Sequence, residues 1–216
     1  MTPKSILFDL DGTLTDSGEG IIKSAIFALN HFGIEAPPAE QMRSFVGPPL
    51  SVGFTRCGVP QELIPEIVEV YRSRYIPIGR FENTPYPGIR ELLEKLKADG
   101  HQLYVATSKP EWMSVEILQH FDLDHYFDLI CGASTDFSRN SKEAVIAHLI
   151  AQCGTQDNMV MIGDTAYDVI GAKEHGIPTI GVDWGYGLNE DMEKAGAVAI
   201  AYTVDQLYEM LSKDEL

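Results

Sequence analysis

From residue 87 onward the chain repeats one pattern, in which short apolar runs alternate with segments of amphipathic helical period. The apolar runs fall at residues 103–106, 128–131, 159–162 and 179–182, and each has the length of a buried strand. Strands that alternate with helices form right-handed crossover units, and such units build a parallel sheet. The sequence therefore predicts an α/β fold.

A further apolar run at residues 4–8 is predicted to add the first strand to this sheet. Its core should contain Ile6, Leu7, Phe8, Val105, Ala106, Ile130, Val160, Met161 and Ile162. The region that follows has helical periodicity and no strand pattern. We therefore expect a Rossmann-like parallel sheet core, residues 1–16 and 81–216, with a small all-helical domain, residues 17–80, inserted after the first strand.

Composition excludes several classes of protein. The formal net charge of −16 argues against a nucleic acid polymer as partner, because phosphate backbones are bound by clustered Lys and Arg. A small anionic substrate would need positive charge concentrated at its site, and Lys109 and Lys142 are candidates for this. No apolar stretch is long enough to span a membrane. The three cysteines suggest neither a disulfide framework nor a zinc site, so we expect a reduced, cytoplasmic monomer or dimer.

Residues 213–216 spell a retention signal of the endoplasmic reticulum, which acts only on a protein that has entered the lumen. The first residues lead into a strand and do not resemble a signal peptide. We therefore expect these four residues to follow a last helix at 204–211, with Leu207, Tyr208 and Leu211 facing the core.

Two acids follow the first predicted strand, in the run Asp9-Leu10-Asp11-Gly12-Thr13-Leu14. Ligands of open α/β sheets bind beyond the carboxyl ends of the strands, where these acids should lie. A carboxylate can attack phosphorus and form an acyl phosphate, and a second acid can transfer the proton of the leaving group. A calcium loop is the alternative, but apolar Leu14 and Ile21 occupy positions where it needs polar or acidic residues.

This run resembles the first motif of the haloacid dehalogenase superfamily of phosphohydrolases, and the order of elements is similar over essentially the whole chain. The resemblance implies that Asp9 is the nucleophile and that Asp11 is the general acid and base. It implies Mg²⁺ bound by the carboxylates of Asp9 and Asp164 and by the main-chain carbonyl of Asp11, with Gly12 in a supporting role. The helical insert would be the cap domain.

The resemblance also implies a phosphate-binding set. Thr107 matches the hydroxyl residue that binds the transferred phosphate, and the backbone N–H of Ser108 would donate at the start of the next helix. An ordinary helix N-cap is the alternative for this pair. Lys142 matches the lysine that neutralises nucleophile and phosphate, although Glu143 replaces the usual proline and Arg139 could assist or replace it.

Gly163-Asp164-Thr165-Ala166-Tyr167-Asp168 resembles the last motif of the superfamily. Magnesium prefers octahedral oxygen ligands and retains waters, so two carboxylates and one carbonyl suffice from the protein. Asp168 should orient a metal-bound water or Lys142. A simple helix cap at Asp164 is the structural alternative.

The chain looks similar to the phosphoglycolate phosphatase-like and 5′-nucleotidase-like branch, which places a similar Gly47-Pro48-Pro49-Leu50 segment in its cap. The implied function is Mg²⁺-dependent hydrolysis of a small phosphomonoester through an aspartyl phosphate, with Gly47, Pro48, Pro49 and Leu50 setting substrate preference. Two alternatives stay open. One is a phosphomutase, for which Arg43, Arg56, Arg72 and Arg74 could hold a bisphosphate; the other is a phospho-accepting signalling or binding module.

Overall fold

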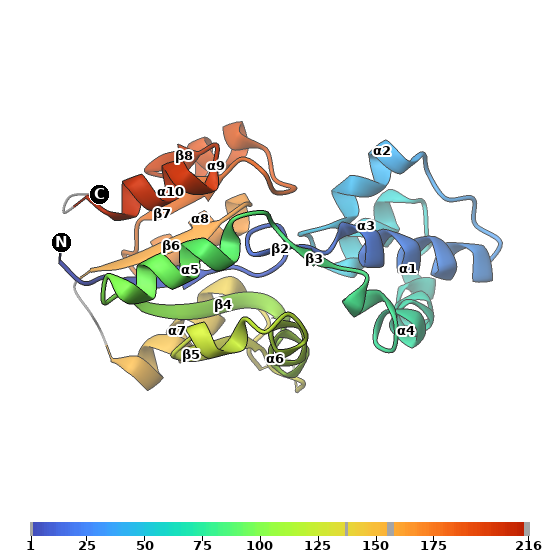
Figure 1. Ribbon diagram of the computed structural model, residues 1–216. Coiled ribbons are helices and arrows are strands. Elements are labelled where there is room, and N and C mark those ends of the chain that lie inside the picture. Colours follow the sequence, from blue (N-terminus) through green and yellow to red (C-terminus); the bar gives the residue numbers. More distant parts are fainter. Residues whose placement is uncertain (1, 137, 155–157, 214–216) are drawn as a thin grey trace. The chain divides into compact units, whose positions relative to one another are not determined.

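The structure is a computed structural model that describes residues 2–136, 138–154 and 158–213 (Figure 1). The chain divides into two compact units, one spanning Asp16–Thr84 and the other made of the residues before and after it. The two segments that connect the units, β2 (Thr15–Asp16) and β3 (Thr84–Pro85), pair as a two-stranded sheet. In the part of the chain described here, no helix is long and apolar enough to cross a membrane.

The larger unit is built on a six-stranded sheet with the strand order β5-β4-β1-β6-β7-β8. All the neighbouring pairs are parallel. The strands are β1 (Ser5–Phe8), β4 (Gln102–Pro110), β5 (Leu129–Ala133), β6 (Met159–Gly163), β7 (Thr179–Val182) and β8 (Ala199–Ala201). The sheet confirms the predicted α/β fold class and places β1, the first strand in the chain, in its interior.

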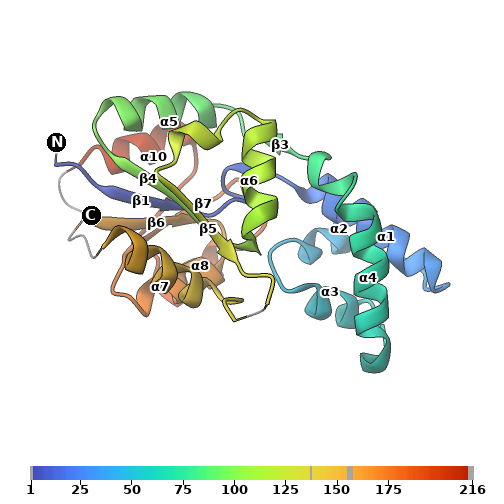
Figure 2. The same cartoon turned by 90° about the horizontal axis from the view of Figure 1, so that it is seen from below.

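Helices cover both faces of this sheet. Figure 2 shows α5 (Ile89–Ala98) and α10 (Val204–Leu211) on one face and α7 (Lys142–Cys153) and α8 (Ala166–Lys173) on the other. The unit also contains α6 (Glu111–His120), α9 (Asn189–Ala195) and a 3-10 turn at Asp124–Tyr126. Both α5 and α10 have one strongly apolar side, and the leucines on it are fully buried, each contributing about 1.5–3 kcal/mol to folding.

The structure corrects several expectations for this unit. Strand β4 continues to Pro110 instead of ending at residue 106, and β8 and α9 were not predicted because their apolar patterns are short. Ile130 is only half-buried, since it lies on the edge strand β5. Tyr208 is also half-buried, and its hydroxyl donates a hydrogen bond to Asp99 at 2.9 Å. Residues 214–216 of the retention-signal sequence lie outside the described residues.

The unit Asp16–Thr84 is helical. Its helices are α1 (Gly18–His31), α2 (Ala39–Met42), α3 (Leu50–Arg56) and α4 (Ile64–Tyr75), with 3-10 turns at Arg43–Phe45, Gln61–Leu63 and Gly79–Phe81. Its core contains edge-to-face contacts between the rings of Phe45 and Phe54 and between those of Phe54 and Tyr71. Gly47, Pro48 and Pro49 are not helical, and α3 begins directly after them at Leu50.

Candidate active site

The site lies at the carboxyl ends of three neighbouring strands of the larger unit. Asp9 directly follows β1, Asp164 directly follows β6, and Thr107 lies in β4 two residues beyond the position that pairs with Phe8. The Asp9 N–H donates to the carbonyl of Ile162 at 2.9 Å, so the backbone pairing continues up to the acidic residue. This is the end of a parallel sheet where ligands bind.

Asp9 is a buried carboxylate with specific partners. Its Oδ1 lies 2.8 Å from the Lys142 Nζ and accepts a hydrogen bond from the Leu10 N–H at 2.8 Å. Burial raises the pKa of Asp9, and the charge of Asp168 adds to this, while Lys142 and a hydrogen bond with Thr107 oppose it. Thr107 is therefore adjacent to Asp9, and its own side chain is buried.

Lys142 links two acids from different elements. It is the first residue of α7, and Ser141 caps that helix by accepting from the Ala144 N–H. The Lys142 Nζ lies 2.7 Å from Asp168 Oδ1 and donates to the carbonyl of Ala106 at 2.8 Å. Burial lowers the pKa of the ammonium, but Asp168 and Asp9 outweigh it and raise the pKa above its ordinary value. The lysine is therefore positively charged between two carboxylates.

Arg139, the possible substitute for Lys142, has other partners. Its Nε donates to the carbonyl of Gly132 at 2.8 Å, and its guanidinium forms an ion pair with Glu111 at 2.6 Å. The only cation with an ion pair to Asp9 among the described residues is Lys142. The structure thus brings Lys142, and not Arg139, to Asp9.

Asp164 is enclosed by glycines. A Cβ at Gly12 or Gly185 would lie 2.2 Å from an Asp164 side-chain atom, and a Cβ at Gly187 would lie 2.0 Å from its backbone oxygen. The Tyr186 N–H donates to Asp164 Oδ2 at 2.8 Å. Burial, followed by the charges of Asp168 and Asp9, raises the pKa of Asp164 well above its ordinary value. A buried acid in this setting is costly to ionise without a cation.

The loop with Trp184 and Tyr186 contacts Asp164, which was not predicted from the sequence. It directly follows β7, and Trp184 anchors it by donating from Nε1 to the carbonyl of Thr13 at 3.1 Å. The two glycines that flank Tyr186 were its only signal, because they follow a predicted strand of the parallel sheet.

Three carboxylates meet at this point. Asp9, Asp164 and Asp168 each offer an oxygen, and these oxygens lie within 4.8 Å of one another. The other oxygen of Asp168 accepts from the N–H and the hydroxyl of Thr165 at 3.0 and 2.8 Å, and this capping box begins α8. An all-oxygen set of buried acids with only one lysine among them has the chemistry that fits Mg²⁺.

Asp11 points to a different partner. Both of its carboxylate oxygens accept from the Lys109 Nζ, at 3.0 and 2.8 Å. Gly12 directly follows Asp11 in the turn after β1, and its φ of +84° is unfavourable for other residues. Asp11, for which we expect the role of general acid, is therefore held by a lysine that we had singled out only for its charge.

Ser108 and the cap residues differ from the central group. Ser108 is exposed within β4, and α6 begins only at Glu111, so the expected helix start at Ser108 is wrong. The strand continues because β4 pairs with β5 again at Pro110 after a shift in register. Gly47, Pro48, Pro49 and Leu50 belong to the unit Asp16–Thr84, where they lead into α3.

Comparison with known proteins gives one family. A model described as haloacid dehalogenase-like hydrolase matches residues 6–182. A 5′-nucleotidase of Pseudomonas aeruginosa is 43% identical over 190 residues, which are 87% of this chain and 86% of that protein.

Two further similarities cover almost the whole chain. The tyrosine-protein kinase PtkA of Mycobacterium tuberculosis is 41% identical over 213 residues, which are 97% of this chain and 73% of that protein. The crystal structure of a predicted phosphatase from Clostridium acetobutylicum matches with a TM-score of 0.91 and 43% identity, over 97% of this chain and 99% of that one.

Proposed function

The chain belongs to the haloacid dehalogenase-like hydrolases and is a phosphoric monoester hydrolase, and we propose that it acts with Mg²⁺ through an aspartyl phosphate on Asp9. The observation that carries this proposal is the 2.8 Å contact between Asp9 and Lys142 beside two more buried acids. A carboxylate paired with a lysine is ionised and able to attack, whereas an isolated buried carboxyl group would be neutral.

In the first half-reaction, a carboxylate oxygen of Asp9 forms a bond to phosphorus while the bond from phosphorus to the alcohol oxygen breaks. Asp11 gives its proton to the departing alcohol oxygen. Lys142 and the hydroxyl of Thr107 donate to the phosphoryl oxygens as charge develops there. The Ser108 N–H lies in the same segment of β4 and supplies a further donor.

In the second half-reaction, Asp11 takes a proton from water, and the resulting hydroxide attacks phosphorus. The bond to Asp9 breaks, which releases inorganic phosphate and restores the carboxylate. Asp9, Asp164 and the main-chain carbonyl of Asp11 would hold the Mg²⁺, with Asp168 positioning Lys142 by their 2.7 Å ion pair. The bound cation would neutralise the negative charge of the acids and of the phosphate that Lys142 alone does not balance.

The ion pair between Lys109 and Asp11 has a role in this sequence. With no substrate bound, Lys109 holds Asp11 in place by contacts to both carboxylate oxygens. An incoming phosphate is dianionic and competes for the lysine. Asp11 is then released, takes a proton from solvent and passes it to the departing alcohol oxygen.

The substrate class is a phosphoglycolate or nucleoside monophosphate type ester, as the similarity to a 5′-nucleotidase favours. The role of Gly47, Pro48, Pro49 and Leu50 in choosing the substrate stays a prediction. The decisive experiment measures phosphate release by purified protein from a panel of phosphomonoesters, with Mg²⁺ and with EDTA. Absence of Mg²⁺-dependent release from every ester would overturn the proposal.

A second function is favoured by the similarity to a protein named tyrosine-protein kinase. A phosphoaspartate can pass its phosphoryl group to any hydroxyl that takes the place of water, so transfer to tyrosine or to a sugar phosphate uses the same residues. The mutase alternative is less favoured, because Arg72 and Arg74 already pair with Glu69 and Glu82. Incubation with labelled ATP or labelled ester, a tyrosine peptide and a hexose phosphate distinguishes transfer from hydrolysis by where the label appears.

A further inference from the structure

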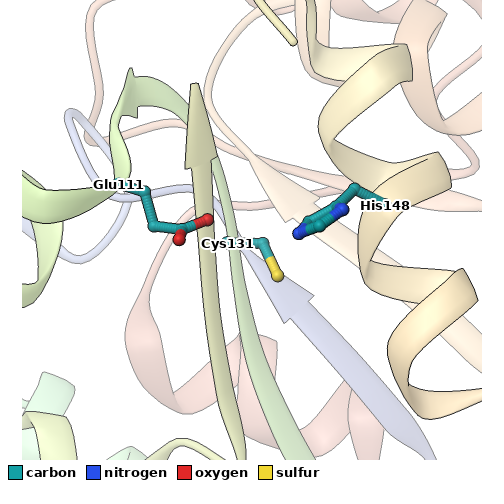
Figure 3. Close-up of side chains that lie close together, drawn as sticks. All are labelled: Glu111, Cys131 and His148. Carbon is teal, nitrogen blue, oxygen red and sulfur yellow. The ribbon is translucent and has the colours of Figure 1, made fainter. Parts of the chain in front are cut away.

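A second group of metal-ligating side chains lies in the larger unit, and it shares no residue with the acidic cluster. Glu111 begins α6, Cys131 lies in β5, and His148 is in the middle of α7. One ligand atom from each lies within 4.8 Å of the others. Figure 3 shows the carboxylate of Glu111 and the ring of His148 directed toward Cys131 from opposite sides.

The burial of the three side chains suits an accessible binding site. Cys131 is 1% exposed, whereas Glu111 and His148 are only partly buried. A cation could therefore reach the thiol from the side of the carboxylate and the imidazole. Around tetrahedral Zn²⁺ the sulfur and nitrogen ligands lie about 3.6 Å apart. Because the three ligand atoms lie within 4.8 Å of one another, the sulfur and nitrogen would have to approach by about 1.2 Å at most to reach that spacing.

Gln152 adds a fourth polar group from the next turn of α7. Its Nε2 donates to the Cys131 Sγ at 3.7 Å and to the His148 Nε2 at 2.7 Å. The amide thus contacts two of the three ligands. Rotation of the amide by half a turn would place its oxygen, in place of Nε2, next to Cys131 and His148.

The hydrogen bonds of Glu111 involve one of its carboxylate oxygens, which leaves the other oxygen to bind a cation. The N–H of Gly132 and the guanidinium of Arg139 both bond to Oε2, at 3.2 and 2.6 Å. A structural reading is that Glu111 only holds the loop that carries Arg139. This reading explains Oε2, but it does not explain why a thiol and an imidazole lie within 4.8 Å of the carboxylate.

The chemistry of the three ligands selects the ion. A thiolate, an imidazole and a carboxylate form a mixed sulfur, nitrogen and oxygen set, which suits borderline-soft Zn²⁺ and not Mg²⁺. Burial, with a smaller contribution from Glu111, raises the pKa of the Cys131 thiol to about 11. The thiol is therefore protonated at neutral pH, and a bond from its sulfur to Zn²⁺ forms as the S–H proton is released to solvent.

We propose that Glu111, Cys131 and His148 form a Zn²⁺ site that is separate from the Mg²⁺ site of the proposed phosphatase. The site would connect α6, β5 and α7 by one ion. Because Glu111 follows the segment with Thr107 and Lys109, bound Zn²⁺ would restrain the end of β4 next to the reaction site.

Co²⁺ is the probe for the first test, because it replaces Zn²⁺ and gives a charge-transfer absorption only with a thiolate ligand. The protein is titrated with Co²⁺ in excess Mg²⁺. We expect this absorption in the unmodified protein and in Asp164→Asn, which alters only the acidic cluster. Cys131→Ser should lose the absorption. Cys153→Ser removes a different free thiol, which is partly buried, and should keep the absorption. Absence of the absorption, or its persistence in Cys131→Ser, overturns the proposal.

The second test measures Zn²⁺ affinity by competition with a chromophoric chelator. We expect His148→Ala and Glu111→Gln each to weaken binding at least tenfold, and His175→Ala, at a partly exposed histidine outside the cluster, to leave it unchanged. About one proton per Zn²⁺ should be released at neutral pH, and none from Cys131→Ser. His148→Ala should keep a cooperative thermal unfolding transition, which shows that its loss of affinity is not a loss of fold. Equal affinity in His148→Ala and the unmodified protein would reject the site even if turnover were lost.

Discussion

The Lys109 ammonium lies 3.0 and 2.8 Å from the two carboxylate oxygens of Asp11. Only 5% of the surface of the Lys109 side chain is exposed. This pair connects the turn after β1 to the end of β4. It therefore couples the proposed general acid to the strand that carries Thr107.

Replacement of Lys109 tests this coupling. We expect Lys109→Met to lower kcat/KM by about 10²-fold, because the proposed acid loses its positioning partner and the substrate loses a cation. Lys97→Met is the matched control, since Lys97 pairs with Asp128 at 2.9 Å away from the site. Steady-state kinetics on the best ester measure both. Equal activity of the two variants would show that the ion pair has no part in the reaction.

Asp9→Asn keeps the size of the side chain and removes the nucleophilic oxygen charge. Turnover should fall at least 10³-fold, while the thermal unfolding transition stays cooperative. Asp205→Asn, in the first turn of α10, is the control for loss of one acidic charge. A loss of turnover by Asp9→Asn of less than tenfold would exclude Asp9 as the nucleophile.

The raised pKa values of Asp9 and Asp164 give a pH prediction. A folded-state pKa above the unfolded value means that the folded protein binds more protons. The contribution of these two acids to the free energy of unfolding without metal therefore decreases as pH rises above 3.8, and Mg²⁺, which would bind the ionised acids, should stabilise more at higher pH. Denaturant unfolding between about pH 5 and 8, with EDTA or Mg²⁺, measures both effects.

The same experiment on Asp164→Asn isolates the contribution of one acid. This variant should depend less on pH than the unmodified protein in EDTA and should gain little stability from Mg²⁺. If Mg²⁺ stabilised both proteins equally, the cation would bind elsewhere.

Gly12→Ala tests the close approach to Asp164. Gly12 and Gly100 have nearly the same φ, +84° and +86°, but a Cβ meets Asp164 at 2.2 Å in the first case and nothing within 4 Å in the second. Gly12→Ala and Gly100→Ala should both be destabilised by the positive φ. Gly12→Ala should be destabilised by about 1–3 kcal/mol more, because its Cβ overpacks against Asp164. It should also lose Mg²⁺-dependent activity. Similar unfolding free energies for the two variants would mean that Asp164 can move away from the new Cβ without a loss of stability.

Beryllium fluoride with Mg²⁺ should inhibit the enzyme by occupying the place of the phosphoryl group on Asp9. In Asp9→Asn, we expect that beryllium fluoride does not inhibit the residual turnover and that calorimetry detects no binding of it. Inhibition that requires added sugar phosphate would indicate a mutase. Binding of the fluoride without turnover of any ester would instead favour a phospho-accepting module.

The fold class was predictable because strand and helix periods alternate along most of the chain, and each predicted strand is present. The short β8 and α9 have too few apolar positions for a period to be recognised. Ile130 looked like a core residue because a strand sequence alone does not say which strand lies at the edge.

The candidate site was predictable where residues follow strand ends, as Asp9 and Asp164 do. The contact of Lys109 with Asp11 was not predictable, because it depends on β4 continuing past residue 106. The Tyr186 loop and the group of Glu111, Cys131 and His148 depend on which elements lie side by side, and sequence spacing does not contain that information.

The central place of β1 has a consequence for folding. Asp9 follows the first strand of the sheet, but its surroundings come from β4, β6 and the loop after β7, which lie far from it in the sequence. Native contacts of such long sequence separation form slowly, because loop closure must precede them. Chains shortened before Tyr186 would contain Asp9, Asp164 and Asp168 but would lack the N–H that donates to Asp164. Phosphatase activity during refolding should therefore appear only after β4, β6 and the loop after β7 have assembled around β1.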